Sequence, residues 1–326
     1  MSEAPLLDAG AWRRALSAAR RPYHDGYYAM YTNAVGGIVT DPALMLVPAD
    51  DHVVHRGDGV FETIKCVDGA VYALDRHLAR LAHSAETIGL LLPVPRDALA
   101  GLVVQTLRAG GRRDALARVI VSRGPGGFGV NPYECPRPGL YIVAYALPPS
   151  FMDAHPSGAR LRSSTVPVKP GVLATIKTCN YLPNALMKKE AVDAGADFAV
   201  AFDERGFLAE GATENFGMVS SDRRLRVPGA DRILSGITMH RALELAEDLV
   251  RAGALAGIET GDIGRRDLEG AAEILVFGTT PDVTAGVEWD GRPVGDGRPG
   301  PVQRELNRRL QADIRSHPAM RTPAFG

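Results

Sequence analysis

The stretch IKTCNYLPNALMKKEAVDAGADFAVAFDERGFLAEGATENF, residues 176–216, decides how this chain is expected to fold. Pro183 suits the first turn of a helix, because proline lacks the N–H group that a first turn leaves unused. Gly195 suits a helix end in the left-handed conformation. Alternating apolar side chains over residues 198–202 then indicate a half-buried strand. The stretch therefore predicts one compact helix–strand unit.

Two chemically useful side chains stand at the ends of this unit. Lys177 follows one apolar run, and Glu210 ends another. A buried lysine has a lowered pKa and can form a Schiff base, while a carboxylate can hold the pyridine nitrogen of pyridoxal phosphate in its protonated form. The spacing by itself favours the ordinary alternative, a surface lysine and a surface glutamate on a structural unit.

Four motifs change that balance, namely KTCNYLPN (177–184), GADFAVAFDERGFLAEGATEN (195–215), GIT (236–238) and GTT (278–280). Together they resemble the class IV, or fold type IV, pyridoxal-phosphate enzymes. That family contains branched-chain and D-amino-acid transaminases, (R)-amine transaminases and 4-amino-4-deoxychorismate lyase. Within the family, the chain is most similar to the plant-type enzymes described both as D-amino-acid transaminase and as aminodeoxychorismate lyase.

The resemblance implies an α/β (α+β) fold with pyridoxal 5'-phosphate bound between two domains. The expected division is an N-terminal extension (1–26), a smaller α/β domain (27–147), a proline-rich linker (148–158) and a larger pseudo-barrel domain that binds the cofactor (159–326). A length of 326 residues with 45% hydrophobic residues is enough for two cores. The resemblance also implies a homodimer.

The net charge, the cysteines and the N-terminal composition limit which partners and which compartment we expect. The formal net charge of −1 gives no reason to expect nucleic acid or a membrane surface. Cys66, Cys135 and Cys179 are scattered without the spacing of a disulfide framework or a zinc site, and no metal-ligand cluster is apparent. The N-terminus has no long apolar core of the kind that a signal peptide needs. We therefore expect a cytoplasmic enzyme that binds no metal.

The cofactor's phosphate is expected at three places. HLARLAHSA (77–85), on a helix predicted over residues 75–88, resembles the family helix whose arginine, here Arg80, binds phosphate. The GIT motif (236–238) stands at the start of a predicted helix, and a helix start with a glycine and a threonine is a natural binding site for phosphate. The same pattern also occurs at helix starts that bind nothing. The resemblance assigns the remaining cofactor contacts to Gly236, Ile237, Thr238 and Thr279, and to Tyr181 at the ring oxygen.

A dinucleotide-binding oxidoreductase is an alternative, because Gly124, Gly126 and Gly129 satisfy G-x-G-x-x-G. The context argues against it. The segment that follows, residues 130–139, contains three prolines and leads into another predicted strand, so no helix N-terminus is available for a pyrophosphate. An NAD-dependent oxidoreductase and a non-catalytic binding module remain as lesser alternatives.

The substrate side is the least determined part of the site. HRGDGVFETIKC (55–66) resembles the family's substrate-side strand. Bacterial relatives carry a carboxylate-binding arginine in the glycine loop, where this chain has Phe128, and Leu116 stands where branched-chain enzymes have a tyrosine. The expected substrate-side residues are Arg56, Phe61, Lys65, Arg118, Phe128, Val130 and Thr280.

Two reactions remain open. We expect a transaminase that moves an amino group between a small amino acid, of D-amino-acid or branched-chain type, and a 2-oxo acid through the Schiff base of Lys177. The absence of an arginine at Phe128 favours a small substrate. The alternative is the lyase that gives 4-aminobenzoate and pyruvate, since Thr63 matches a threonine that those lyases use in catalysis.

Overall fold

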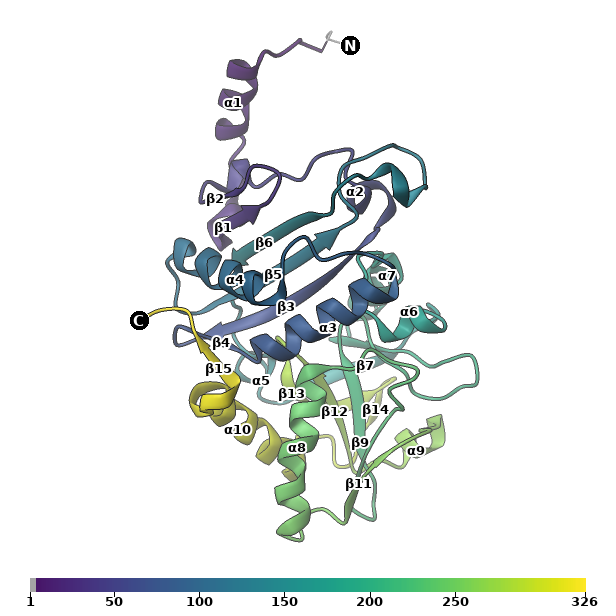
Figure 1. The fold of residues 1–326 in the computed structure, drawn as a ribbon. Coiled ribbons are helices and arrows are strands. Elements are labelled where there is room, and N and C mark those ends of the chain that lie inside the picture. Colours follow the sequence, from purple (N-terminus) through teal and green to yellow (C-terminus); the bar gives the residue numbers. More distant parts are fainter. Residues whose placement is uncertain (1–3) are drawn as a thin grey trace.

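The computed structural model describes residues 4–326, so the first residues of the expected N-terminal extension lie outside it. The chain builds two β-sheets, each with helices packed against it (Figure 1). The elements of the first half are α1 (Ala9–Ala18), β1 (Tyr27–Thr32), β2 (Gly37–Val39), α2 (His52–Arg56), β3 (Gly59–Val67), β4 (Ala70–Tyr72), α3 (Leu74–Thr87), α4 (Arg96–Gly110), β5 (Ala115–Ser122) and β6 (Gly139–Tyr145).

The second half begins after a proline-rich connection. Its elements are α5 (Phe151–Ala154), β7 (Ala159–Ser163), α6 (Val172–Thr175), α7 (Leu182–Asp193), β8 (Phe198–Val200), β9 (Asn215–Val219), β10 (Arg224–Val227), α8 (Ile237–Arg251), β11 (Gly257–Thr260), α9 (Arg265–Glu269), β12 (Glu273–Gly278), β13 (Asp282–Trp289), β14 (Arg292–Pro293), α10 (Pro301–Ser316) and β15 (Arg321–Pro323). Short 3-10 turns are η1 (Pro22–Gly26), η2 (Pro42–Leu44), η3 (Pro132–Glu134) and η4 (Pro318–Met320).

The first sheet has the strand order β15-β4-β3-β5-β6-β1-β2, and every pairing in it is antiparallel. Helices α3 and α4 cover one face (Figure 1). Side chains alternate along β3, so Val60, Ile64 and Cys66 enter the core below those helices. Phe61 and Thr63 therefore lie on the opposite face.

The second sheet has the order β11-β10-β9-β12-β13-β7-β8, with β14 paired to β13. Its centre, β9-β12-β13, is antiparallel, and β7 joins β13 in parallel. Helices α8 and α10 pack against it, with Leu306, Leu310 and Ala246 among the fully buried side chains of the shared core. The expected mixed α/β fold is confirmed.

Backbone hydrogen bonds between β3 and the segment of Lys177 join the two halves. The N–H of Phe61 in β3 donates to the carbonyl of Lys177 (3.0 Å), and the N–H of Cys179 donates to the carbonyl of Gly59 (2.8 Å). These bonds place the lysine segment along the end of β3. The proposed domain limits stay a prediction, and one strand departs from them: β15, at the end of the expected larger domain, pairs with β4 in the first sheet.

The predicted helix–strand unit is present. Helix α7 begins at Leu182 with Pro183 in its first turn, and Gly195 closes it with φ of 69°. Strand β8 follows, and the turn over residues 203–206 is held by the carboxylate of Asp203, which accepts from the N–H of Phe207 (2.9 Å). Across residues 4–326, no helix combines the length and the apolar character that a bilayer span requires.

Candidate active site

Lys177 is buried, with 8% of its surface exposed. Its Nζ donates to the hydroxyl of Tyr181 (3.2 Å) and lies 4.7 Å from the centre of the Phe61 ring. Its backbone N–H donates to Oγ of Ser84 (3.2 Å). Burial, and next the positive charge of Arg80, lower the pKa of Lys177 to about 8. A large fraction of this amine is therefore neutral near pH 8, as a nucleophile or a base requires.

Glu210 is the second member of the pair singled out by the sequence. It lies in an isolated bridge with Asn215 and is 9% exposed. Burial raises its pKa, whereas the N–H of Leu234, which donates to Oε2 (3.1 Å), and the charges of Lys169 and Lys177 act in the opposite direction. The side chain is therefore a buried acceptor whose pKa is influenced by the charges of two lysines.

Arg80 extends from α3 and is fixed by a residue that the sequence analysis missed. Its Nε and Nη2 donate to the two oxygens of Glu62 (2.7 and 2.8 Å), and Glu62 Oε2 also bonds Nδ1 of His77 (2.7 Å). Burial alone would raise the pKa of Glu62, but the charges of Arg80 and His77 hold it at about 2. A signal was available, because Glu62 shares the core face of β3 with Val60 and Ile64, and a charge there needs a partner.

The remaining Nη1 of Arg80 donates to the carbonyl of Ser235 (2.8 Å), which places the guanidinium beside the start of α8. Gly236 is the N-cap of that helix, and a Cβ there would lie 1.8 Å from Oδ1 of Asn215, so only glycine fits. Ile237 and Thr238 form the first turn, whose N–H groups have no acceptor inside the helix.

Thr279 and Thr280, two further expected site residues, lie in the turn after β12. Oγ1 of Thr279 donates to the carbonyl of Thr63 in β3 (3.4 Å), so the turn lies against the first sheet. Thr280 is half-buried in the same turn. A guanidinium, a helix N-terminus and threonine hydroxyls are the groups that bind a phosphate ester. With Glu210, Tyr181 and the lysine, the donor set fits pyridoxal phosphate.

Phe61 and Arg118, two of the expected substrate-side residues, lie close to Lys177. The guanidinium of Arg118 lies 5.0 Å from the centre of the Phe61 ring, and Arg118 is the cross-strand partner of Thr63 in the β3–β5 register. Nη2 of Arg118 makes one long hydrogen bond to the hydroxyl of Tyr145 (3.4 Å), and its Nε is buried without a partner among residues 4–326. Arg118 therefore has donors to spare.

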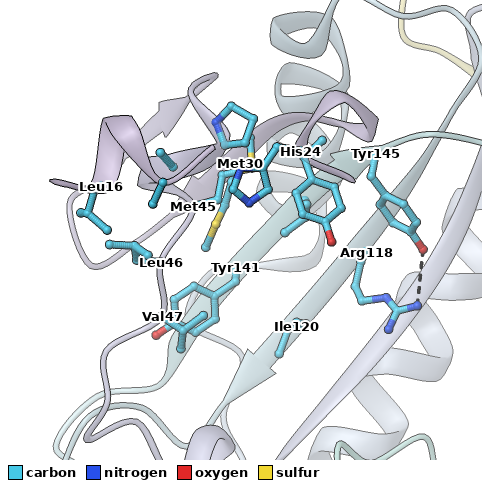
Figure 2. A pocket seen from close by; sticks show the side chains of 15 residues that line it. Leu16, His24, Met30, Met45, Leu46, Val47, Arg118, Ile120, Tyr141 and Tyr145 are labelled. Carbon is cyan, nitrogen blue, oxygen red and sulfur yellow. Dashed lines mark hydrogen bonds between the residues drawn. The ribbon is translucent and has the colours of Figure 1, made fainter. Parts of the chain in front are cut away.

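A cavity of about 500 Å³ opens beside Arg118 on the face of the first sheet opposite α3 and α4 (Figure 2). Its floor is formed by strands β5 and β6, with Ile120 and Tyr141 pointing into it, and Leu16 of α1 lies at its rim (Figure 2). The lining is largely apolar, which makes Arg118 its principal cationic group.

The other basic candidates make their contacts elsewhere. Nζ of Lys65 pairs with Oδ1 of Asp282 (2.5 Å), a buried partner that the sequence analysis missed. The guanidinium of Arg56 donates to the carbonyls of Phe128 (2.5 Å) and Gly129 (3.1 Å) and so holds the glycine loop. Neither residue contacts Lys177 or Tyr181 through these groups.

The glycine loop itself is a surface feature. Phe128 is 69% exposed and Val130 is 79% exposed, so neither side chain is packed against the buried lysine. The loop leads through the 3-10 turn η3 into β6, and β6 pairs antiparallel with β5. A dinucleotide-binding glycine loop would instead open an α-helix between parallel strands. This arrangement does not support the oxidoreductase alternative.

Metal-ligating side chains are not gathered in the part of the chain that the structure describes. No group of three or more histidine, cysteine, aspartate or glutamate side chains in residues 4–326 is arranged to hold a metal ion. The expectation that the enzyme binds no metal stays a prediction.

Comparisons with known proteins agree with this geometry. Residues 59–289 match the family described as amino-transferase class IV. The chain is 38% identical over 293 residues to the chloroplastic D-amino-acid transaminase of Arabidopsis thaliana, a match that covers 90% of this chain and 78% of that protein. It is 31% identical over 268 residues to a putative branched-chain-amino-acid aminotransferase of Methanocaldococcus jannaschii, covering 82% of this chain and 90% of that one.

Among solved structures, the T.th. branched-chain amino acid aminotransferase in complex with N-(5'-phosphopyridoxyl)-L-glutamate is similar, with a TM-score of 0.83 and 27% identity. The match covers 92% of this chain and 99% of that one. The chain therefore belongs to the class IV aminotransferases, the pyridoxal-phosphate-dependent enzymes that move amino groups between amino acids and 2-oxo acids.

Proposed function

We propose that this enzyme transfers the amino group of a small amino acid, of D-amino-acid or branched-chain type, to a 2-oxo acid, with Lys177 as catalytic base and Arg118 as carboxylate anchor. One observation carries the proposal. The buried Nζ of Lys177 and the donor-rich guanidinium of Arg118 lie at 4.7 and 5.0 Å from the centre of the same Phe61 ring. A substrate held by its carboxylate at Arg118 would present its Cα to the lysine.

Pyridoxal phosphate, when bound, condenses with amino groups and withdraws electrons from the carbon that carries them. Lys177 Nζ would take the proton from the substrate's Cα and deliver it to the C4′ carbon of the cofactor, the transfer that transamination requires, and its pKa of about 8 suits both steps. Tyr181 holds that amine through its hydroxyl at 3.2 Å. Glu210 is proposed to accept from the protonated ring nitrogen of the cofactor.

The phosphate is assigned to Arg80, to the start of α8 at Gly236, Ile237 and Thr238, and to Thr279. The two hydrogen bonds that Arg80 donates to Glu62 support this assignment, because they fix the plane of the guanidinium before a ligand arrives. A side chain that is already oriented loses less conformational entropy when it binds.

Arg118 is preferred among the basic residues as the carboxylate anchor. Lys65 is neutralised by Asp282, and Arg56 is occupied by two loop carbonyls. The apolar cavity beside Arg118 provides room for a small aliphatic side chain, which supports the small-substrate assignment.

The lyase reaction is retained as a second candidate because of Thr63. Its side chain shares a sheet face with Phe61 and stands opposite Arg118, so a hydroxyl lies on the substrate side of β3. A hydroxyl in this position could donate a proton to the departing pyruvate unit.

We also propose that the enzyme acts as a cytoplasmic homodimer. The segment around the cavity supports dimerisation, since Leu44, Leu46 and Val47 are exposed apolar residues at or beside it. The three unpaired cysteines support a reducing compartment. Sedimentation velocity would measure the assembly, and a monomer at micromolar concentration would contradict it.

The experiment that separates the two reactions uses three incubations: D-alanine with 2-oxoglutarate, L-leucine with 2-oxoglutarate, and aminodeoxychorismate alone. Glutamate is measured in the first two and 4-aminobenzoate in the third. We expect glutamate in at least one of the first two. Fast 4-aminobenzoate release with negligible glutamate would overturn the transaminase proposal, and its loss in Thr63→Val would identify the proton donor.

A further inference from the structure

Helices α8 and α10 both begin at a glycine, but their first turns have different partners. The N-cap of α8 is Gly236, and no side chain within residues 4–326 caps this helix. The N-cap of α10 is Gly300, and there the carboxylate of Glu273 accepts from the N–H groups of Val302 (2.9 Å) and Gln303 (2.8 Å). The first turn of α10 is therefore used by the protein itself, whereas that of α8 can bind an anion.

A hydrogen bond between two side chains fixes the start of α8 instead. Oγ of Ser235 and Nε2 of His240 lie 2.7 Å apart. Ser235 precedes the N-cap, and His240 is the fourth residue of the helix. An apolar contact between these two positions often fixes the angle at which a chain enters a helix. Here a hydrogen bond, which we call the Ser235–His240 staple, joins them and uses none of the backbone N–H groups of the first turn.

The staple holds a segment that contacts two groups assigned to the cofactor. The carbonyl of Ser235 accepts from Nη1 of Arg80 (2.8 Å). The N–H of the preceding Leu234 donates to Oε2 of Glu210 (3.1 Å), and the carbonyl of Leu234 accepts from Nδ2 of Asn215 (2.9 Å). This short segment is therefore bonded both to the arginine proposed for the phosphate and to the carboxylate proposed for the ring nitrogen.

His240 acts in this staple through a hydrogen bond and not through charge. Burial lowers the pKa of His240 below its ordinary value of 6.5, against the charge of Glu244, and the charges of Arg76 and Arg80 lower it further. The imidazole is therefore mostly neutral at about pH 7.5. His240 also lines a cavity of about 410 Å³ together with Arg80 and the exposed His83. His83 thus provides a second histidine in the same surroundings that is not part of the staple.

We propose that Ser235 and His240 are positioning residues for the phosphate of the cofactor. Their hydrogen bond holds the carbonyl of Ser235 against Arg80 and sets the direction in which the uncapped N–H groups of α8 point. Neither side chain is assigned a contact with the phosphate itself. The inference rests on the phosphate site proposed above.

The test compares two ligands that differ only in the phosphate ester, pyridoxal phosphate and pyridoxal. Equilibrium dialysis against the apoenzyme gives the dissociation constant of each, and the readout is the preference for the phosphorylated ligand. Loss of one neutral hydrogen bond in Ser235→Ala or His240→Leu should weaken the binding of pyridoxal phosphate roughly 2- to 12-fold and leave that of pyridoxal unchanged. His240→Gln, whose amide can still bond the hydroxyl of Ser235, should remain close to the wild type. His83→Leu, in the same cavity, is the matched control.

Equal losses of affinity for the two ligands would mean that the pair only supports the fold, and this result would overturn the proposal, as would a wild-type preference in Ser235→Ala and His240→Leu. Arg80→Ala separates the inference from the phosphate assignment. If Arg80→Ala loses the preference and the staple variants keep it, the staple is wrong and the phosphate site stands. If Arg80→Ala keeps the preference, the phosphate site itself is wrong. Should His240→Leu not fold, Ser235→Ala carries the same test, because it removes a single hydroxyl.

Discussion

The carboxylate of Glu62 accepts two hydrogen bonds from the guanidinium of Arg80, at 2.7 and 2.8 Å, deep between β3 and α3. Glu62 is fully buried, and His77 supplies a third contact at 2.7 Å. Strand β3 and helix α3 are thereby held to each other through charge. If Arg80 binds the cofactor as proposed, the same pair links cofactor binding to the stability of the fold.

Acid should destabilise the protein through Glu62. Its pKa is about 2 in the folded chain against a reference value of 4.5, so its ionised form stabilises the fold above pH 4.5 and this contribution is lost as the pH falls toward 2. The difference corresponds to about 3 kcal/mol. Urea unfolding at about pH 5, 4 and 3 should show the wild type losing stability faster than Glu62→Gln.

A suitable control is Glu305→Gln. Glu305 also pairs with two arginines, Arg308 and Arg309, but on the surface of α10, where solvent screens the charges. Its acid dependence should match the wild type. Equal slopes for Glu62→Gln and the wild type would mean that the buried pair does not couple to folding.

Arg80→Ala should weaken the retention of pyridoxal phosphate. A charge-assisted hydrogen bond is worth about 1.5–3 kcal/mol, or roughly 10- to 150-fold in affinity. Equilibrium dialysis against the cofactor measures the change. Arg76→Ala is the control, because Arg76 lies on the same helix and pairs with Glu244 at the surface. Cofactor affinity that survives in Arg80→Ala would place the phosphate elsewhere.

Lys177 should react with the cofactor in a pH-dependent way. Burial and Arg80 lower its pKa to about 8, so the neutral amine increases as the pH rises through that value. The rate at which apoenzyme takes up pyridoxal phosphate should rise with a midpoint near pH 8, as followed by stopped-flow absorbance. Borohydride reduction and peptide mass spectrometry should find the pyridoxyl group on Lys177. Label on Lys188 or Lys189, or a midpoint near the ordinary lysine value of about 10.4, would contradict the assignment.

Arg118→Gln should raise the KM for 2-oxoglutarate by about 10- to 150-fold, because a carboxylate loses a charge-assisted partner. Its kcat should change less, since the lysine is untouched. Arg56→Gln, which alters only the hydrogen bonds from this side chain to the carbonyls of the glycine loop, should change KM less. If Arg56→Gln has the larger effect, the loop side carries the substrate carboxylate instead.

Local signals in the sequence were sufficient for much of the fold. Pro183 and Gly195 marked the two ends of α7 correctly, because each residue has a backbone constraint of its own. The start of α3 was harder. The helix predicted over residues 75–88 begins at Leu74, after Ala73 in the left-handed conformation, and alanine gives no sign of that geometry.

Ion pairs between residues far apart in the sequence could not be predicted from such local signals. The charges of Lys65 and Arg80 were visible in the sequence, but Asp282 lies 217 residues after Lys65 and becomes its neighbour only when the two sheets meet. Lys169 stands among prolines with no periodicity to mark its burial. Residue type suggests which chemistry is possible. Whether a charged side chain is ion-paired or available for a ligand depends on tertiary contacts.

The pairing of β15 with β4 has a consequence for biosynthesis. The first sheet contains strands from the first half of the chain, yet its edge is closed by Arg321–Pro323, which are translated after every other strand of the two sheets. Until then, β4 exposes unpaired backbone groups that can recruit another strand. The sheet that is translated first is thus completed last, so a nascent chain stalled before Arg321 would carry an open edge. A truncation that removes β15 would act on the first sheet.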